Sequence, residues 1–236
     1  MSVRLVFLHA FPLDSRMWDG QQLLLSGQVE APDLYARGDS LEEWAEDVLD
    51  TIGGGPLIVV GCSMGGSCAL EVAQSAPDRV SALVLVGTKA GHNPDPAYRD
   101  GFITRLEQGG ANALWSEIQT DLIGSQAPRA VVDRIRTLMQ AQRTEDLIRA
   151  VRAFHSRRDL SEVASRWNKP LLVMCGDKDR VVTESKTAAF VASTQSGVMH
   201  VMRHCGHYIN MERPSEFNRI IADFVDTVDR GVSCGR

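Results

Sequence analysis

The chain has 236 residues, enough for one sizeable hydrophobic core or for a core with an inserted subdomain. Its composition is 44% hydrophobic and 23% charged, with a net charge of −5, so no basic excess favours nucleic acid or an anionic membrane as a partner. No apolar run approaches the roughly 18 residues that cross a bilayer, and the short apolar N-terminus is typical of a strand, not of a signal peptide. The five cysteines include no CxxC pair and are odd in number, which favours reduced thiols and a cytoplasmic location.

From the N-terminus onward, runs that are apolar throughout predict buried strands, and amphipathic patterns between them predict helices. The strands are expected at residues 4–10, 28–34, 56–62, 79–88, 169–177 and 197–203. The helices are expected at residues 15–27, 40–55, 65–76, 183–193 and 214–228. This alternation predicts an α/β protein with a mainly parallel sheet covered on both faces.

Cap signals mark the ends of the first two helices. Ser15 and Ser40 are the expected N-caps, and Glu43 occupies the capping-box position after Ser40. Gly27 is expected to end the first helix.

The alternation is interrupted between about residues 90 and 165. The stretch "HNPDPAYRDG" predicts a proline-rich linker, and helical patterns alone follow it, at residues 103–110, 111–124, 127–140 and 144–156. We therefore expect a helical insertion at 91–166 between two parts of one core, residues 1–90 and 167–236. Acidic and basic residues alternate within the insertion, so its charges are expected to form solvated helix faces.

The stretch "GCSMGG" at residues 61–66 lies between a predicted strand and a predicted helix. The pattern G-x-S-x-G at such a junction is a nucleophile elbow, in which a strained turn exposes the hydroxyl of Ser63. The alternative is a glycine-rich turn that serves packing alone. Cys62 beside the serine is expected to pack, because the elbow exposes only its central residue.

A serine nucleophile needs a base and an orienting carboxylate, in the chain order Ser, Asp or Glu, His. The loop after the predicted strand 169–177 offers Asp177 and Asp179, and the loop after strand 197–203 offers His204 and His207. Both loops follow strands, where open α/β sheets carry their active sites.

Four segments together resemble the α/β-hydrolase superfamily, in particular small ester hydrolases of the carboxylesterase and enol-lactonase type. "FLHAFPLDSRMW" resembles the H-G-x-P oxyanion segment of that family, with Ala10 in place of the usual glycine, and "GCSMGG" resembles its G-x-S-x-G-G. "GDKD" resembles its acid loop, and "CGHYINMERP" its histidine loop. The resemblance covers nearly the whole core. It implies the α/β-hydrolase fold with about six strands, lacking the family's N-terminal hairpin, and a lid formed by the helical insertion.

The resemblance also assigns roles. It selects Asp179 over Asp177 and His207 over His204, and it makes Ser63 the nucleophile, His207 the base and Asp179 its orienting acid. The backbone N–H groups of Phe11 and Met64 would then form the oxyanion hole.

The substrate pocket is expected on the inner face of the lid. Its candidates are six apolar residues, whose alternative is plain packing against the core: Phe102, Leu114, Trp115, Leu122, Met139 and Phe154. His9 is expected to be structural, bonding the backbone near the oxyanion loop, although it could also touch substrate.

These features predict a serine hydrolase that cleaves carboxylic esters through an acyl-enzyme, with no cofactor. Metal binding is not expected, because the six histidines show no ligand spacing. Alternatives with the same triad are a lactonase and a carbon–carbon bond hydrolase, and a further alternative is a non-catalytic small-molecule receptor on this fold. The expected partner is a small-molecule ester or lactone, with no nucleic acid or membrane. The sequence leaves the oligomeric state open.

Overall fold

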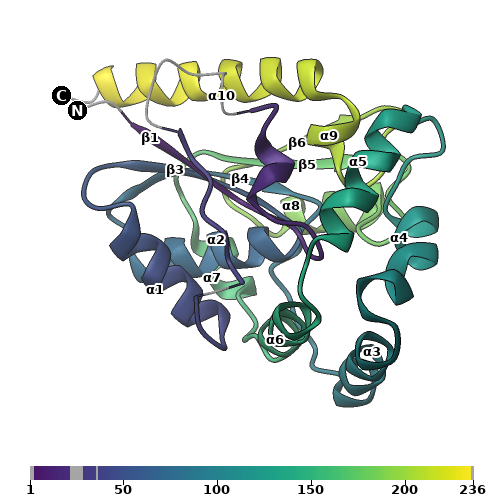
Figure 1. Cartoon of the computed structure of the whole chain (residues 1–236). Helices are drawn as coiled ribbons and strands as arrows, with labels where there is room; N and C mark the ends of the chain where they lie inside the picture. The colour runs from purple at the N-terminus through teal and green to yellow at the C-terminus, as the bar shows by residue number, and fades with distance from the viewer. Residues whose placement is uncertain (1–2, 22–28, 36, 235–236) are drawn as a thin grey trace.

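The computed structural model describes residues 3–21, 29–35 and 37–234, and these contain a six-stranded sheet in which all neighbouring strands are parallel. The strand order is β2-β1-β3-β4-β5-β6 (Figure 1). The strands are β1 (Arg4–Leu8), β2 (Val29–Glu30), β3 (Leu57–Cys62), β4 (Val80–Val86), β5 (Leu171–Gly176) and β6 (Gly197–Met202). The prediction of about six mostly parallel strands is therefore confirmed.

The central strands are buried on both faces. Every residue of β3 and β5 is buried, which explains why their sequences show no alternation of apolar and polar residues. The edge strands are less protected: β2 has two residues, and Val198 in β6 is 63% exposed. The strand expected at 28–34 is shortened because Pro32 lacks the N–H that a sheet ladder requires, and residue 28 lies outside the described residues.

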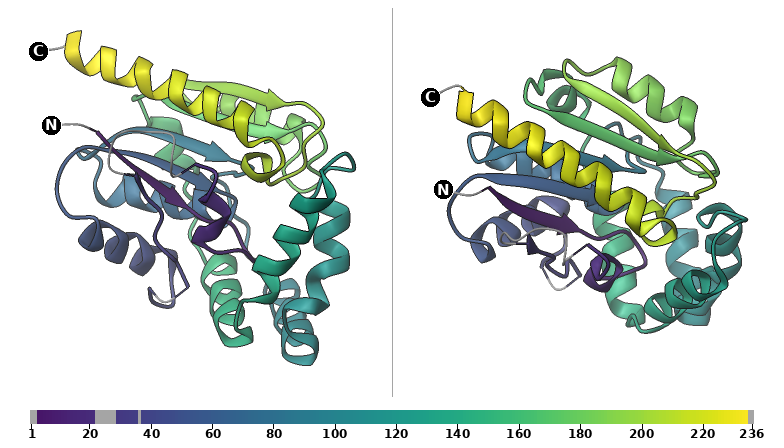
Figure 2. Two further views of the ribbon diagram at one scale, coloured as in Figure 1. Left: turned by 45° about the horizontal axis from the view of Figure 1, so that its top comes forward. Right: turned by 90° about the horizontal axis from the view of Figure 1, so that it is seen from above.

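Helices cover both faces of the sheet. Helices α1 (Leu41–Thr51) and α2 (Met64–Ser75) lie on one face, and Figure 2 shows α10 (Pro214–Cys234) lying across the opposite face. Helix α8 (Glu184–Ala192) packs against β5 and β6, and the short α9 (Ile209–Glu212) precedes α10. None of the helices in the described ranges has a stretch long and apolar enough to cross a membrane.

One of the two predicted helix caps is confirmed. The Ser40 hydroxyl accepts a hydrogen bond from the Glu43 N–H at 3.2 Å, while the Glu43 carboxylate accepts one from the N–H of Asp39.

Over the described residues 15–21, the first predicted helix is wrong in type and cap. A 3-10 helix, η1 (Ser15–Trp18), forms there, and its N-cap is Asp14, whose carboxylate accepts from the Arg16 N–H at 3.0 Å. Asp14 is the N-cap instead of Ser15 because its side chain reaches the N–H of Arg16, two residues further along the chain. The expected helix end at Gly27 lies outside the described residues.

Six short helices lie between β4 and β5. They are α3 (Pro96–Gly109), the 3-10 helix η2 (Gly110–Leu114), α4 (Trp115–Asp121), α5 (Arg129–Gln140), α6 (Thr144–His155) and α7 (Ser161–Arg166). Figure 1 shows α3, α4 and α6 gathered beside one end of the sheet.

The linker expected at 92–101 is wrong over its second half, where α3 begins at Pro96. The Asp95 carboxylate accepts from the Tyr98 N–H at 2.9 Å, and a proline at the first helical position is preorganised for the helix. Proline here starts a helix instead of preventing one.

Candidate active site

The turn between β3 and α2 holds Ser63 in a strained conformation. Its φ is 53° and its ψ −115°, and its N–H donates to the carbonyl oxygen of Val86 at 2.8 Å. A Cβ on Gly61 would lie 2.3 Å from the Gly65 oxygen, and a Cβ on Gly65 would lie 2.2 Å from the Leu8 oxygen. Gly61 is therefore required for β3 to turn directly into α2, and Gly65 is required for α2 to lie against the end of β1.

A buried acid–histidine pair lies in the loops after β5 and β6. His207 Nδ1 lies 2.6 Å from Asp179 Oδ2, and both side chains are buried. Asp179 Oδ1 accepts from the N–H groups of Val181 and Val182, at 2.8 and 2.9 Å. Burial alone would raise the pKa of Asp179, but His207 and these two N–H donors hold it below its usual value. The carboxylate is thus ionised and fixed in direction toward the imidazole.

The other acid and the other histidine serve a different purpose. His204 is exposed, has a φ of 61°, and donates its backbone N–H to Asp177 Oδ1 at 2.6 Å. Asp177 also pairs with Lys178 at 3.3 Å. Asp177 therefore joins the acid loop to the backbone of the histidine loop. The acid and histidine whose side chains contact each other are Asp179 and His207.

Gly87, which follows β4, gives the imidazole its space. Its φ is 53°, and a Cβ there would lie 2.8 Å from His207 Nδ1 and 2.7 Å from Cε1. Sequence reasoning missed this residue, because its partner lies 120 positions away along the chain.

Hydrogen bonds of the backbone and of the Glu212 side chain join the helical insertion to the histidine loop. The His207 N–H donates to the Leu122 oxygen at 2.7 Å. The buried Glu212 carboxylate accepts from the N–H groups of both Gly206 and Gly124, at 3.0 and 3.1 Å, and burial raises the pKa of Glu212. Glu212 belongs to the histidine-loop motif, but its contact with the insertion at Gly124 could not be predicted from that motif.

Two backbone N–H groups near Ser63 are available to an oxyanion. Within the part of the chain that the structure describes, neither Phe11 nor Met64 donates its N–H to a protein acceptor. Met64 is the first residue of α2, where N–H groups have no intrahelical partner and the helix dipole is positive. Their use as an oxyanion hole stays a prediction.

Ser63 and His207 open into an apolar cavity of about 210 Å³ under the helical insertion. Four of the predicted pocket residues line it: Phe102, Leu114, Leu122 and Phe154. A second cavity, of about 310 Å³, also reaches Ser63 from the side of Gly87.

Three predicted pocket residues lie outside the apolar cavity. Met139 is fully buried in α5, and the Trp115 ring stacks with the guanidinium of Arg136, 5.2 Å from the ring centroid. Leu114 and Ile118 of this segment line the cavity, and Trp115 does not.

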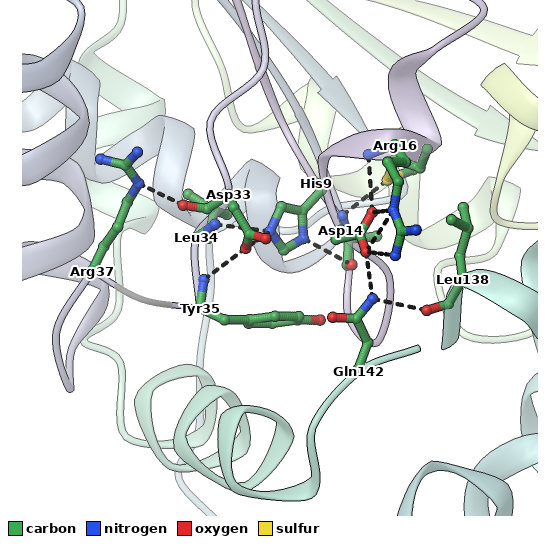
Figure 3. Close-up of polar contacts among 11 residues, drawn as sticks. His9, Asp14, Arg16, Asp33, Leu34, Tyr35, Arg37, Leu138 and Gln142 are labelled. Carbon is green, nitrogen blue, oxygen red and sulfur yellow. Dashed lines mark hydrogen bonds and ion pairs between the residues drawn. The ribbon is translucent and has the colours of Figure 1, made fainter. Parts of the chain in front are cut away.

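His9, the third of them, has a structural role (Figure 3). It is fully buried, its Nε2 accepts from the Leu34 N–H at 2.9 Å, and its Nδ1 lies 3.3 Å from the Ala10 oxygen. Asp33, 3.3 Å from Nε2, accepts from the Tyr35 N–H, so His9 ties the segment before Phe11 to residues 33–35.

Figure 3 also shows how the same loop is held to α5. The buried Asp14 carboxylate accepts from Arg16 and from the side-chain amide of Gln142, which also donates to the Leu138 oxygen. Burial alone would raise the pKa of Asp14, but these donors keep it below its usual value.

Four cysteines whose side chains the structure describes provide packing and no nucleophile. Cys62, Cys68, Cys175 and Cys205 are free and buried, and burial raises the pKa of Cys62. Among the described residues, no three His, Cys, Asp or Glu side chains are grouped as metal ligands.

Comparison with known proteins gives related hydrolases. The profile of the alpha/beta hydrolase family matches residues 5–220. An esterase of Mycobacterium tuberculosis is 26% identical over an alignment spanning 95% of this chain and 83% of that protein. A 2-hydroxy-6-oxononadienedioate/2-hydroxy-6-oxononatrienedioate hydrolase of Paraburkholderia xenovorans is 30% identical over 71% of this chain and 61% of that protein.

Solved structures share the fold at lower identity. A thermophilic esterase of Thermogutta terrifontis superposes with a TM-score of 0.89 at 23% identity, covering 97% of this chain and 91% of that one. The enol-lactonase of Burkholderia xenovorans gives 0.85 at 21% identity, covering 96% and 92%. These similarities confirm the predicted α/β-hydrolase fold.

Proposed function

Because the chain belongs to the alpha/beta hydrolase family, we propose that it is a serine hydrolase that cleaves carboxylic esters with Ser63, His207 and Asp179 as its catalytic triad. The observation that carries the proposal is the 2.6 Å contact between Asp179 and His207, in a protein where His207 and the strained Ser63 line one cavity. An oriented imidazole in the same cavity as a serine is what nucleophilic acyl transfer requires.

In the proposed reaction the Ser63 hydroxyl oxygen attacks the ester carbonyl while His207 Nε2 accepts its proton. Asp179 keeps the other proton on Nδ1 and stabilises the imidazolium that forms. The tetrahedral intermediate collapses when His207 returns the proton to the departing alcohol, leaving an acyl group on Ser63. Water, deprotonated by the same imidazole, then releases the acid.

The oxyanion of both tetrahedral intermediates would be bound by the N–H groups of Phe11 and Met64. Their availability within the described structure supports this role. Removing one such donor costs about 3 kcal/mol in comparable sites. The proposal requires neither a cofactor nor a metal.

Residues 91–166 would act as the lid. Phe102, Leu114, Leu122 and Phe154, all from this segment, line the cavity at Ser63, which favours a substrate with an apolar part. A small-molecule ester or a lactone fits this description, and the reduced, buried cysteines favour a cytoplasmic enzyme.

Carbon–carbon bond cleavage is a second candidate with the same residues. It is favoured by the similarity to the Paraburkholderia hydrolase, a protein named for its oxo-dioate substrates. In that reaction the bond broken lies between two carbons. The triad would then have to protonate the carbon of the leaving group, where ester cleavage requires protonation of its oxygen.

The test is a panel of p-nitrophenyl esters from acetate to octanoate, together with simple lactones, assayed with the wild-type protein and Ser63→Ala. We expect the wild type to hydrolyse at least one ester, and the variant to lose roughly 10³-fold or more in kcat. Ser63 is only half-buried, so the variant should keep its fold. An unchanged rate in the variant would contradict the proposal, and turnover of nothing in the panel would favour a receptor.

A further inference from the structure

The second cavity at Ser63 differs from the first in its charge. Of about 310 Å³, it is lined by Ser63 and by four basic side chains: Lys89, His92, His155 and Arg157. We call it the basic cavity. Asp95, an exposed residue that caps α3, is the acidic residue of its lining.

Arg157 is the buried charge of this cavity. Its side chain is 6% exposed, and among the described residues no carboxylate pairs with it. Of its five N–H donors one is used, from Nη1 to the Phe154 oxygen, and Nε is buried without any acceptor. Burial lowers the pKa of Arg157 to about 10, which still leaves it charged at neutral pH.

The buried carboxyl groups of the described structure have partners: Glu212 accepts from the N–H groups of Gly206 and Gly124, and the others contact basic side chains. Glu71 pairs with Arg158, Asp14 with Arg16, and Asp179 with His207. A buried cation without a counter-ion is unfavourable unless something outside the chain supplies the missing acceptor.

Arg157 also affects the two histidines. Burial, followed by the charge of Arg157, lowers the pKa of His92, and the same two causes lower the pKa of His155 to about 4. Both imidazoles are therefore neutral at pH 7, so the cations of the lining are the buried Arg157 and the exposed Lys89.

We infer that the basic cavity is a carboxylate subsite, so that the preferred substrate is an ester or lactone that carries a free carboxylate held by Arg157. This inference rests on the proposed function and adds a substrate class to it. A planar carboxylate matches the guanidinium fork, and it would accept from the N–H groups of Nη2, which have no protein acceptor among the described residues. The apolar part of the substrate would lie in the apolar cavity on the other side of Ser63.

A structural role for Arg157 is the competing explanation. Its guanidinium lies 3.9 Å from the centroid of the Phe154 ring and donates to the last turn of α6, whose dipole favours a cation. The experiment must therefore separate recognition of an anion from support of the fold.

Kinetic measurements on matched pairs of substrates distinguish recognition of an anion from support of the fold. The acyl-side pair is the p-nitrophenyl monoester of glutaric acid and neutral p-nitrophenyl hexanoate. The alcohol-side pair is carboxymethyl butyrate and neutral propyl butyrate. The proteins are the wild type, Arg157→Gln, Arg157→Lys and, as control, Arg152→Gln, which changes an exposed arginine of α6 outside both Ser63 cavities.

We expect the wild type to favour the carboxylate ester in at least one pair. Arg157→Gln should lower that preference at least tenfold, through KM, with the neutral ester changed less than threefold. Arg157→Lys should retain part of the preference, and the control all of it. The inference is overturned if the wild type has no preference in either pair, or if Arg157→Gln slows neutral and anionic esters equally.

A binding measurement separates this inference from the proposed function. Glutarate is titrated into the protein while the ring protons of His92 and His155 are followed by NMR across pH. A bound carboxylate should raise both pKa values in the wild type and in Arg157→Lys, but not in Arg157→Gln.

A rise in the pKa values of His92 and His155 without any ester turnover would support the carboxylate subsite and contradict the proposed function. Ester turnover with neither a rise nor a substrate preference would overturn the subsite and leave the function standing. A larger rise with inorganic phosphate than with glutarate would overturn the carboxylate assignment.

Discussion

The chemistry proposed for Ser63 depends on the single carboxylate that orients His207. Asp179→Asn should lower kcat by roughly 10³- to 10⁴-fold, because an amide favours the wrong imidazole tautomer. Asp177→Asn should cost less than about tenfold, because Asp177 contacts the His204 backbone and not the imidazole. Steady-state kinetics on one ester check both variants. A larger loss from Asp177→Asn would mean that the acid has been assigned to the wrong residue.

His155 should make the protein less stable in acid. Burial and the charge of Arg157 lower the pKa of His155 to about 4, from an ordinary 6.5, so between these values the unfolded chain binds a proton that the folded chain does not. Stability is therefore lost as the pH falls below 6.5. Because the side chain is partly solvated, we expect the wild type to lose about 1 kcal/mol more than His155→Gln between pH 7 and pH 5.

Urea unfolding at the two pH values checks this expectation. His204→Asn, which changes an exposed histidine, is the control and should behave as the wild type. Equal losses in the wild type and in His155→Gln would show that His155 does not titrate differently on folding.

At the scale of the elements, the turn after β4 should determine whether the imidazole can occupy its place. Gly87→Ala puts a methyl group into the space of the His207 ring, and we expect kcat to fall at least roughly tenfold. Gly53→Ala is the matched control: its φ of 65° is equally left-handed, but no atom lies within 4 Å of the added Cβ. Both variants should lose about 1 kcal/mol of stability, by thermal unfolding, from the strained backbone. Equal activities would show that the His207 ring moves aside freely.

The helices between β4 and β5 should select substrates through the residues that face the apolar cavity. Phe102 lies in α3, lines that cavity, and contacts the Phe11 ring at 5.7 Å between centroids. Phe102→Ala should change the ratio of kcat/KM for octanoate and acetate esters by about tenfold, as 1–3 kcal/mol of apolar contact would.

Trp115→Ala is the control for that experiment, because Trp115 lies outside the cavity lining. It should leave the chain-length profile parallel to that of the wild type. A changed profile in Trp115→Ala with an unchanged one in Phe102→Ala would place the binding face of the insertion on the other side of α4.

At the scale of the whole molecule, the strands were predictable because burial on both faces leaves a plain signal. The short apolar runs of β3 and β5 are typical of buried strands. Each strand is found within two residues of its expected ends. Short elements without such a pattern were missed, among them α7 and the 3-10 form of η1. Elements of four to six residues carry too little periodicity to be recognised.

The residues of the site also differ in whether the sequence could predict them. Ser63 and its glycines could be predicted because a short sequence motif contains them all. The roles inferred for Gly87 and Arg157 could not be predicted, because each depends on residues distant in the sequence: an imidazole beside Gly87, and the lack of a carboxylate paired with Arg157 among the described residues. Trp115 was misplaced because the 3-10 turn before α4 sets which side of that helix faces the cavity.

The most direct test of the central claim is covalent labelling of the nucleophile. The protein is treated with diethyl p-nitrophenyl phosphate, which transfers a diethylphosphoryl group to an activated serine, and the modified peptide is identified by mass spectrometry. We expect one label, on Ser63, with the loss of esterase activity proportional to labelling. Asp179→Asn, which leaves the imidazole poorly oriented, should be labelled far more slowly. Rapid labelling at another residue, with Ser63 unmodified while activity is lost, would contradict the account.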